Sequence, residues 1–309
     1  MGQTESRVFD GFAGQVIATE NSTIHARVGG SGPPLLLLHG FPETSLMWRN
    51  VAPLLAEDFT TVCPDLRGYG ESGCPPSDDR HEPYSKRAMG RELISAMKAL
   101  GFHRFAVAGH DRGGRIAYRM ALDAPAIVTR LAVLDVIPIG DAWAMADSRL
   151  ALAFWPWSLL AQPAPLPETL IGAAPHALLD DALSNWGTPA ECFPPEVRQA
   201  YLRPFNDPAR VHAICEEFRA AATIDREDDE ADQRAGRKIM CPTLALWDSR
   251  GALETWYGKE GGPLAIWRRW VERVEGNAVE GGHFFPEARP RETAAELLTF
   301  FRGTSRTAS

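Results

Sequence analysis

Apolar residues in the first half of the chain alternate between strand-like runs and helix-like spacing. Apolar and polar residues alternate in the two short segments on either side of Glu20-Asn21-Ser22, which predicts a β-hairpin. Continuous apolar runs follow, of the kind that forms strands buried on both faces of a sheet. The predicted strands are 15–19, 23–28, 35–38, 60–63, 105–108 and 131–136, and the predicted helices are 48–56, 84–100 and a helix directly after Gly114. Strands that alternate with helices predict a mainly parallel sheet covered on both sides.

The pattern changes after residue 138. From 139 to about 236 the apolar runs are helical or irregular and rich in Trp and Pro, and an acidic run at 225–232 is interpreted as a solvated helix face or connector. Alternation then resumes with a strand at 243–247, a helix at 264–274, a short strand at 278–279 and a final helix at 291–301. We therefore expect an α/β core formed by residues 1–138 and 237–309, with a helical cap of residues 139–236 inserted between two core strands.

Composition narrows the class of protein. The chain has 309 residues, of which 45% are hydrophobic and 23% are charged, and its net charge is −8. These values are ordinary for a soluble globular protein, and the negative charge predicts neither a nucleic-acid nor a membrane partner. No cleavable leader is apparent, and the five cysteines lack metal-ligand spacing. We expect a cytoplasmic protein with reduced thiols, without a metal or cofactor.

Residues 106–119, AVAGHDRGGRIAYR, hold the main chemical signal. An apolar strand ends in Gly109-His110-Asp111-Arg112-Gly113-Gly114, and a helical pattern begins at once. A strand, a sharp glycine-flanked turn and a helix form the setting of a nucleophile elbow, with Asp111 where esterases carry Ser. An ordinary strand-to-helix loop with a surface Asp is the alternative.

An aspartate at this position changes the chemistry that the elbow serves. A serine that attacked an alkyl carbon would leave an ether, which water does not cleave. A carboxylate leaves an ester on the enzyme, which water can release. Asp111 therefore indicates displacement at saturated carbon, either carbon–halogen cleavage or epoxide opening, and argues against a lipase or peptidase.

Five local motifs resemble those of α/β-hydrolase-fold haloacetate (fluoroacetate) dehalogenases. They are His39-Gly40-Phe41-Pro42, residues 65–70 (DLRGYG), residues 109–113 (GHDRG), residues 281–284 (GGHF) and, in the cap, residues 157–168 (WSLLAQPAPLPE). The resemblance spans roughly residues 10–302. It implies a mostly parallel eight-stranded sheet flanked by helices, an inserted helical cap, and no cofactor.

His283 is the expected general base. It follows a short strand and two glycines, where the chain order of this fold places the histidine after the nucleophile and the acid. Asp135 and Asp248 each follow a strand and compete to orient its imidazole. The resemblance favours Asp135, whose Leu-Asp-aliphatic-Pro setting matches that of the family.

The substrate contacts are also predicted. By analogy with the fold, the backbone N–H groups of Phe41 and Arg112 stabilise the oxyanion. Arg112 and Arg115 lie one and four residues after Asp111, so both guanidinium groups can converge near it and clamp a substrate carboxylate. Related haloalkane dehalogenases and epoxide hydrolases usually carry Trp at the Arg112 position, which separates anionic from neutral substrates.

The residues expected to bind the halide differ from those of the family. Fluoroacetate-active relatives carry His-Trp where this chain has Pro156-Trp157, and Tyr where it has Phe218. Trp157 keeps one indole N–H for the halide, but two donors are missing. Trp155, Trp186 and His176 are candidates to replace them, although packing within the cap is the favoured interpretation of these three residues.

These observations predict a haloacetate dehalogenase that converts a short 2-haloacid to the 2-hydroxyacid and halide, with chloride and bromide preferred over fluoride. An epoxide hydrolase would use the same Asp111 and His283 but usually needs two acidic tyrosines, and only Tyr201 lies in the cap, with Tyr257 beyond it. A non-catalytic scaffold of this fold is the third reading, and it leaves a complete set of nucleophile, base and acid without a purpose. A homodimer is what the resemblance suggests.

Overall fold

A computed structural model describes residues 9–303. Within these residues one sheet has eight strands in the order β1-β2-β4-β3-β5-β6-β7-β8. Strands β3 to β8 pair in parallel, and β1 and β2 add an antiparallel edge. The strands are β1 Ala13–Ala18, β2 Thr23–Gly29, β3 Pro34–Leu38, β4 Thr60–Pro64, β5 Phe105–His110, β6 Val128–Leu134, β7 Thr243–Asp248 and β8 Val274–Val279. The predicted mostly parallel sheet is confirmed.

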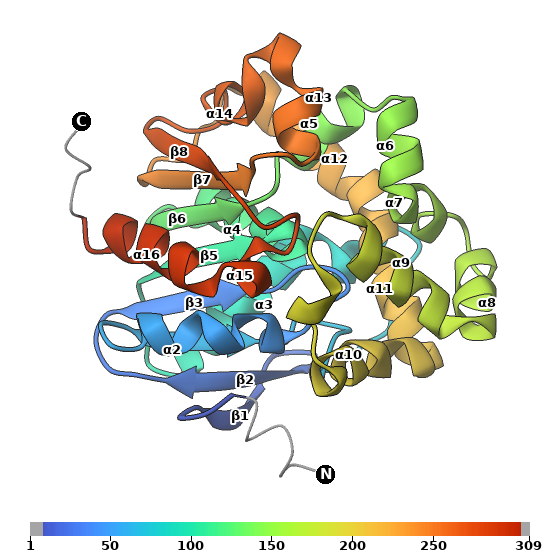
Figure 1. The fold of residues 1–309 in the computed structure, drawn as a ribbon, viewed down its shortest axis with the longest axis horizontal. Coiled ribbons are helices and arrows are strands. Elements are labelled where there is room, and N and C mark those ends of the chain that lie inside the picture. The colour runs from blue at the N-terminus through green and yellow to red at the C-terminus, as the bar shows by residue number, and fades with distance from the viewer. Residues whose placement is uncertain (1–8, 304–309) are drawn as a thin grey trace.

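Helices cover both faces of this sheet. Figure 1 shows α2 and α16 in front of it and α3 and α4 behind it. These core helices are α2 Ala52–Leu55, α3 Lys86–Ala99, α4 Asp111–Asp123, α13 Ala252–Trp256, α14 Gly262–Trp267, α15 Phe285–Ala288 and α16 Pro290–Phe301. The helical pattern predicted at 48–56 is divided into a 3-10 helix, Ser45–Asn50, and α2. No helix in residues 9–303 combines the length and the apolar character that crossing a membrane requires.

The chain between β6 and β7 is helical and gathers at one end of the strands (Figure 1). Its α-helices are α5 Ile139–Ala144, α6 Ser148–Ala153, α7 Trp155–Leu160, α8 Leu166–Ala173, α9 Pro175–Asn185, α10 Pro195–Leu202, α11 Pro208–Ala222 and α12 Ile224–Arg234. This is the expected inserted helical cap.

The helix predicted at 264–274 is wrong in its second half. Helix α14 ends at Trp267, and β8 begins at Val274, which pairs with Thr243 of β7. The indole N–H of Trp267 donates to the carbonyl oxygen of Val136 at 2.9 Å, and that of Trp270 donates to Asp141 at 2.5 Å. These two buried anchors direct the chain back to the sheet, so tertiary contacts override the local helical spacing.

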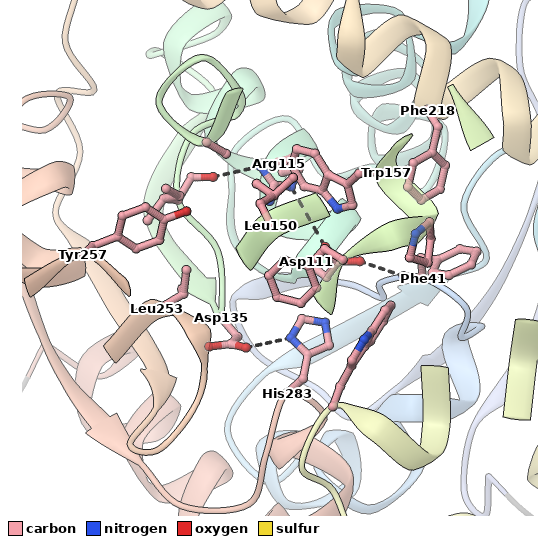
Figure 2. Close-up of a pocket in the computed structure, with 15 residues that line it drawn as sticks. Phe41, Asp111, Arg115, Asp135, Leu150, Trp157, Phe218, Leu253, Tyr257 and His283 are labelled. Atoms are coloured by element: carbon pink, nitrogen blue, oxygen red, sulfur yellow. Dashed lines mark hydrogen bonds and ion pairs between the residues drawn. The ribbon is translucent and has the colours of Figure 1, made fainter. Parts of the chain in front are cut away.

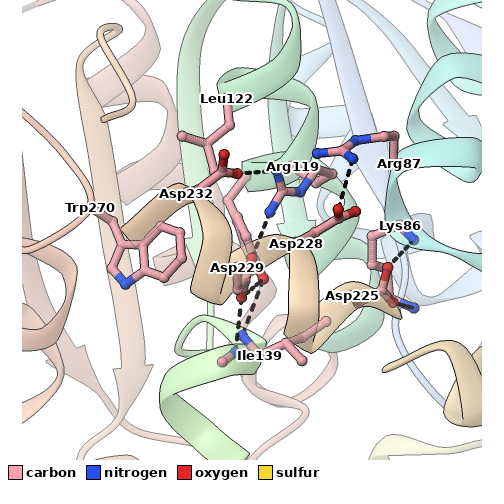
Figure 3. A network of polar contacts seen from close by, with 12 residues as sticks. Lys86, Arg87, Arg119, Leu122, Ile139, Asp225, Asp228, Asp229, Asp232 and Trp270 are labelled. Atoms are coloured by element: carbon pink, nitrogen blue, oxygen red, sulfur yellow. Dashed lines mark hydrogen bonds and ion pairs between the residues drawn. The ribbon is translucent and has the colours of Figure 1, made fainter. Parts of the chain in front are cut away.

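The acidic run at 225–232 is not simply a solvated face. Asp225, Asp229 and Asp232 lie on one side of α12 at helical spacing and are buried against the core. Arg119 of α4 donates to Asp229 at 2.6 Å and to Asp232 at 2.5 Å, and Asp225 forms an ion pair with Lys86 at 3.6 Å (Figure 3). The buried cations turn this face of the helix inward and fix the end of the cap to the core.

Candidate active site

The turn between β5 and α4 presents Asp111 at the end of the sheet. Asp111 has a φ of 41°, a left-handed conformation that is strained for a residue with a side chain. The chain packs closely around it, because a Cβ added to Gly109 would lie 2.4 Å from the backbone of Gly113, and one added to Gly113 would lie 2.4 Å from the carbonyl oxygen of His39. The glycines therefore allow the strained turn that the sequence predicts.

The two oxygens of Asp111 have different surroundings. The backbone N–H of Phe41 donates to Oδ2 at 3.1 Å, whereas Oδ1 lies 4.0 Å from Nε of Arg115, beyond hydrogen-bond distance. Burial opposes ionisation of this carboxyl, but His283, Arg112 and Arg115 outweigh it and lower the pKa of Asp111. The carboxylate is thus ionised, buried and held by one oxygen.

His283 and Asp135 lie together beside Asp111 (Figure 2). Nδ1 of His283 is 2.6 Å from Oδ2 of Asp135, and both residues line the same pocket as Asp111. Asp135 follows β6 with a φ of 52°, which turns its side chain toward the histidine. Asp248, the competing acid, instead accepts the backbone N–H of Gly282 at 3.1 Å through Oδ1.

His39 and His110 lie beside turns and contact backbone groups. Nε2 of His39 accepts the N–H of Leu66 at 2.9 Å. Nε2 of His110 is 2.8 Å from the carbonyl oxygen of His283, and its Nδ1 is 3.2 Å from Glu43. His110 therefore connects the elbow directly to the loop that carries His283.

The pocket above Asp111 is small and mostly apolar, with a cavity of about 30 Å³. Arg115 enters it from α4, with its guanidinium 4.4 Å from the ring centre of Trp157 and its Nη1 donating to the carbonyl oxygen of Ile137 at 2.9 Å. Nε of Arg115 is buried and has no hydrogen-bond partner among residues 9–303. Sequence reasoning missed several of the residues that line the other walls, and no motif marks them: Ile137, Ala142, Leu150, Phe154 and Leu253.

Arg112 takes a different position from Arg115. It is buried and does not line the pocket; its Nε donates to Glu217 Oε1 at 3.1 Å and its Nη2 donates to the carbonyl oxygen of Glu217 at 3.2 Å. Its guanidinium lies 4.0 Å from the ring centre of Phe218, which does line the pocket. Nη1 of Arg112 is buried and has no partner in the part of the chain that the structure describes. The two arginines therefore do not converge as a symmetrical clamp, and Glu217, which sequence reasoning missed, holds one of them.

The part of the pocket expected to bind the halide contains few hydrogen-bond donors. Pro156, Trp157 and Phe218 line it (Figure 2). The indole N–H of Trp155 donates to Asp181 at 2.7 Å and that of Trp186 to the carbonyl oxygen of Ala153 at 3.1 Å, and His176 is exposed. None of the three candidate replacements directs a donor into the pocket. The described residues also contain no group of three or more His, Cys, Asp or Glu that could hold a metal ion.

Comparisons with known proteins agree with this geometry. The sequence pattern of the alpha/beta hydrolase fold family matches residues 33–260. A fluoroacetate dehalogenase from Burkholderia sp. is 43% identical over 294 residues, which is 95% of each chain. This chain belongs to the α/β-hydrolase-fold haloacetate dehalogenase family. Its fold matches an α/β hydrolase structure from Nostoc sp. PCC 7120 with a TM-score of 0.92 and 44% identity, over 96% of this chain and 99% of that one. A soluble epoxide hydrolase from Corynebacterium sp. (strain C12) is 33% identical over 90% of this chain and 93% of its own.

Proposed function

We propose that this member of the dehalogenase family hydrolyses short 2-haloacids, such as chloroacetate, to the 2-hydroxyacid and halide through an ester on Asp111. The observation that carries this proposal is the pairing of Asp111 with Arg115 in one small apolar pocket. A buried guanidinium with an unpartnered Nε needs an anionic partner, and Asp111 is too far away to supply a hydrogen bond. A substrate carboxylate meets that need, with its α-carbon next to the nucleophile.

In the first step, Oδ1 of Asp111 attacks the α-carbon, and the halide leaves with the electrons of the carbon–halogen bond. Oδ2 continues to accept the hydrogen bond from the N–H of Phe41 and becomes the carbonyl oxygen of the new ester. Attack by Oδ1 is favoured because this oxygen accepts no hydrogen bond that would weaken it as a nucleophile.

In the second step, His283 takes a proton from water, and the hydroxide attacks the ester carbonyl carbon. The negative charge develops on the oxygen that already accepts the Phe41 N–H, so this donor is in place before the charge forms. In the collapse, the bond between the carbonyl carbon and the alkyl oxygen breaks, and this oxygen takes the proton from His283 and leaves as the hydroxyl of the hydroxyacid. The Asp111 carboxyl then releases the remaining proton to solvent and returns to the carboxylate. Asp135 keeps the proton of the imidazole on Nδ1, which leaves Nε2 free to act as the base.

We also propose a preference for chloride and bromide over fluoride. Fluoride is a poor leaving group and needs donors directed at its developing charge, and each lost donor costs roughly 3 kcal/mol, or about a hundredfold in rate. The pocket offers the Trp157 indole beside the apolar Pro156 and Phe218. The larger halides spread their charge and depend less on such donors.

A halide-release panel tests both proposals. Initial rates are measured at saturating fluoro-, chloro- and bromoacetate, with a neutral epoxide as the control. We expect fast chloride and bromide release and weak or absent fluoride release, and Pro156→His combined with Phe218→Tyr should raise fluoride release selectively. Fluoride release as fast as chloride release would refute the halide preference, and no release of any halide would refute the dehalogenase activity.

Epoxide hydrolysis is the second candidate function, since a soluble epoxide hydrolase is also a relative. Tyr257 lines the pocket, but burial raises its pKa to about 12, which makes it a poor acid for opening the ring. The other candidate, Tyr201, donates its hydroxyl to Glu287 at 2.5 Å and does not line the pocket. Diol formation from the control epoxide at a rate comparable to chloride release would favour this candidate.

A further inference from the structure

Glu217 of α11 lies at the centre of a buried cluster between the cap and the core. It accepts the hydroxyl of Tyr69 at 2.8 Å and the Nε of Arg112 at 3.1 Å, and it forms an ion pair with Lys86 at 2.9 Å. Its side chain is fully buried. Burial alone would oppose the charge, but Arg112 and Lys86 outweigh it and lower the pKa of Glu217 to about 2.

The contacts of Glu217 control which edge of Arg112 remains available. The carboxylate holds Nε, the backbone carbonyl of the same residue holds Nη2, and Phe218 packs against the plane of the guanidinium. Only Nη1 has no partner within residues 9–303. Because a guanidinium is planar and rigid, fixing two of its nitrogens also fixes the direction of the third.

We propose that Glu217 is a positioning residue that sets the affinity of the site for the substrate carboxylate by holding Arg112 beside the pocket, against the rings of Trp157 and Phe218 that line it, with Nη1 as its one free donor. The proposal rests on the dehalogenase function above. Glu217 reaches the substrate only through Arg112, so its loss weakens carboxylate binding more than it slows the reaction at Asp111.

Asp225 supplies a matched control. It is a buried carboxylate that also faces Lys86, at 3.6 Å, and accepts the backbone N–H of Lys86 at 2.8 Å (Figure 3), but it forms no hydrogen bond or ion pair with Arg112 in the described structure. Glu217→Gln and Asp225→Asn therefore each remove one buried negative charge from the neighbourhood of Lys86. Only Glu217→Gln changes the charge that holds Arg112.

The experiment compares steady-state kinetics on chloroacetate and calorimetric binding of acetate in the wild type and both variants. We expect Glu217→Gln to raise KM and the acetate Kd about tenfold or more, the size of a charge-assisted hydrogen bond, with a smaller change in kcat. Asp225→Asn should lower the melting temperature while KM and the acetate Kd stay near the wild-type values.

Several results would overturn the positioning role. One is an unchanged KM and acetate Kd in Glu217→Gln, and another is a fall in kcat alone. A third is an equal rise of KM and of the acetate Kd in both variants, which would indicate a general loss of packing. A wild type that binds acetate but releases no halide would instead refute the proposed function, and the acetate Kd values would still decide the role of Glu217.

Discussion

Replacing Asp135 by Asn should separate the two half-reactions of the enzyme. The side chain of Asp135 has two distinct duties: Oδ1 accepts the backbone N–H of Asp248 at 3.0 Å, and Oδ2 meets Nδ1 of His283 at 2.6 Å. An asparagine would keep its carbonyl oxygen toward the Asp248 N–H, because an amide NH₂ there would face another donor. Its NH₂ group would then point at Nδ1 of His283.

That orientation gives the imidazole the wrong tautomer. Nδ1 would become an acceptor, the proton would move to Nε2, and the nitrogen that should take a proton from water would already carry one. In triads of this type the corresponding change lowers kcat by about 10⁴. Attack of Asp111 on the substrate does not use His283 as a base, so the first step should proceed at close to its normal rate.

The assay is rapid-quench mass spectrometry with chloroacetate. We expect Asp135→Asn to release about one halide per active site and then stall, with the alkylated enzyme visible as a mass adduct. The matched control is Asp248→Asn, whose amide oxygen can still accept the N–H of Gly282, and turnover should change only a few-fold. A severe loss in Asp248→Asn with a mild loss in Asp135→Asn would refute the assignment of the acid, and full turnover in both would refute the role of the His283 tautomer.

Two further predictions follow from the charges around the pocket. Arg115→Leu should abolish chloroacetate turnover while circular dichroism shows an intact fold, since Arg115 is the one arginine or lysine among the described residues that line the pocket; retained turnover would show that the carboxylate binds elsewhere. The pKa of Glu217 is about 2 in the folded protein, below its unfolded value near 4.3, so its stabilisation is present above about pH 4.3 and is lost as the pH falls toward 2. The wild type should therefore lose on the order of 3 kcal/mol more than Glu217→Gln across that range in urea unfolding, and parallel losses would contradict this.

Sequence reasoning could find the strands and the elbow because their signals are local. Runs such as 35–38 and 105–108 are too apolar to be anything but buried, and the glycines around Asp111 are required by a strained turn. The prediction that His283 is the base rests on chain order. The helical insertion between β6 and β7 also has a local signal, because strand patterns disappear from the sequence after residue 138.

The remaining features depend on contacts between distant residues. Asp135 and Asp248 both follow strands, and only the three-dimensional structure shows which one reaches His283. The acidic face of α12 is buried against Arg119, which lies more than a hundred residues earlier in the sequence. Arg112 is not part of the pocket lining and is held by Glu217, which lies more than a hundred residues later. Spacing along one helix gave no sign of either partner.

The central claim is that the oxygen of the product comes from Asp111. Single-turnover hydrolysis of chloroacetate in ¹⁸O-labelled water, with enzyme in excess, tests it directly. The covalent mechanism predicts unlabelled glycolate after one turnover and one ¹⁸O atom in the peptide that contains Asp111, because water attacks the ester carbonyl carbon. Label in the glycolate of the first turnover, with none in the peptide, would show that water attacks the substrate itself and would contradict the covalent mechanism.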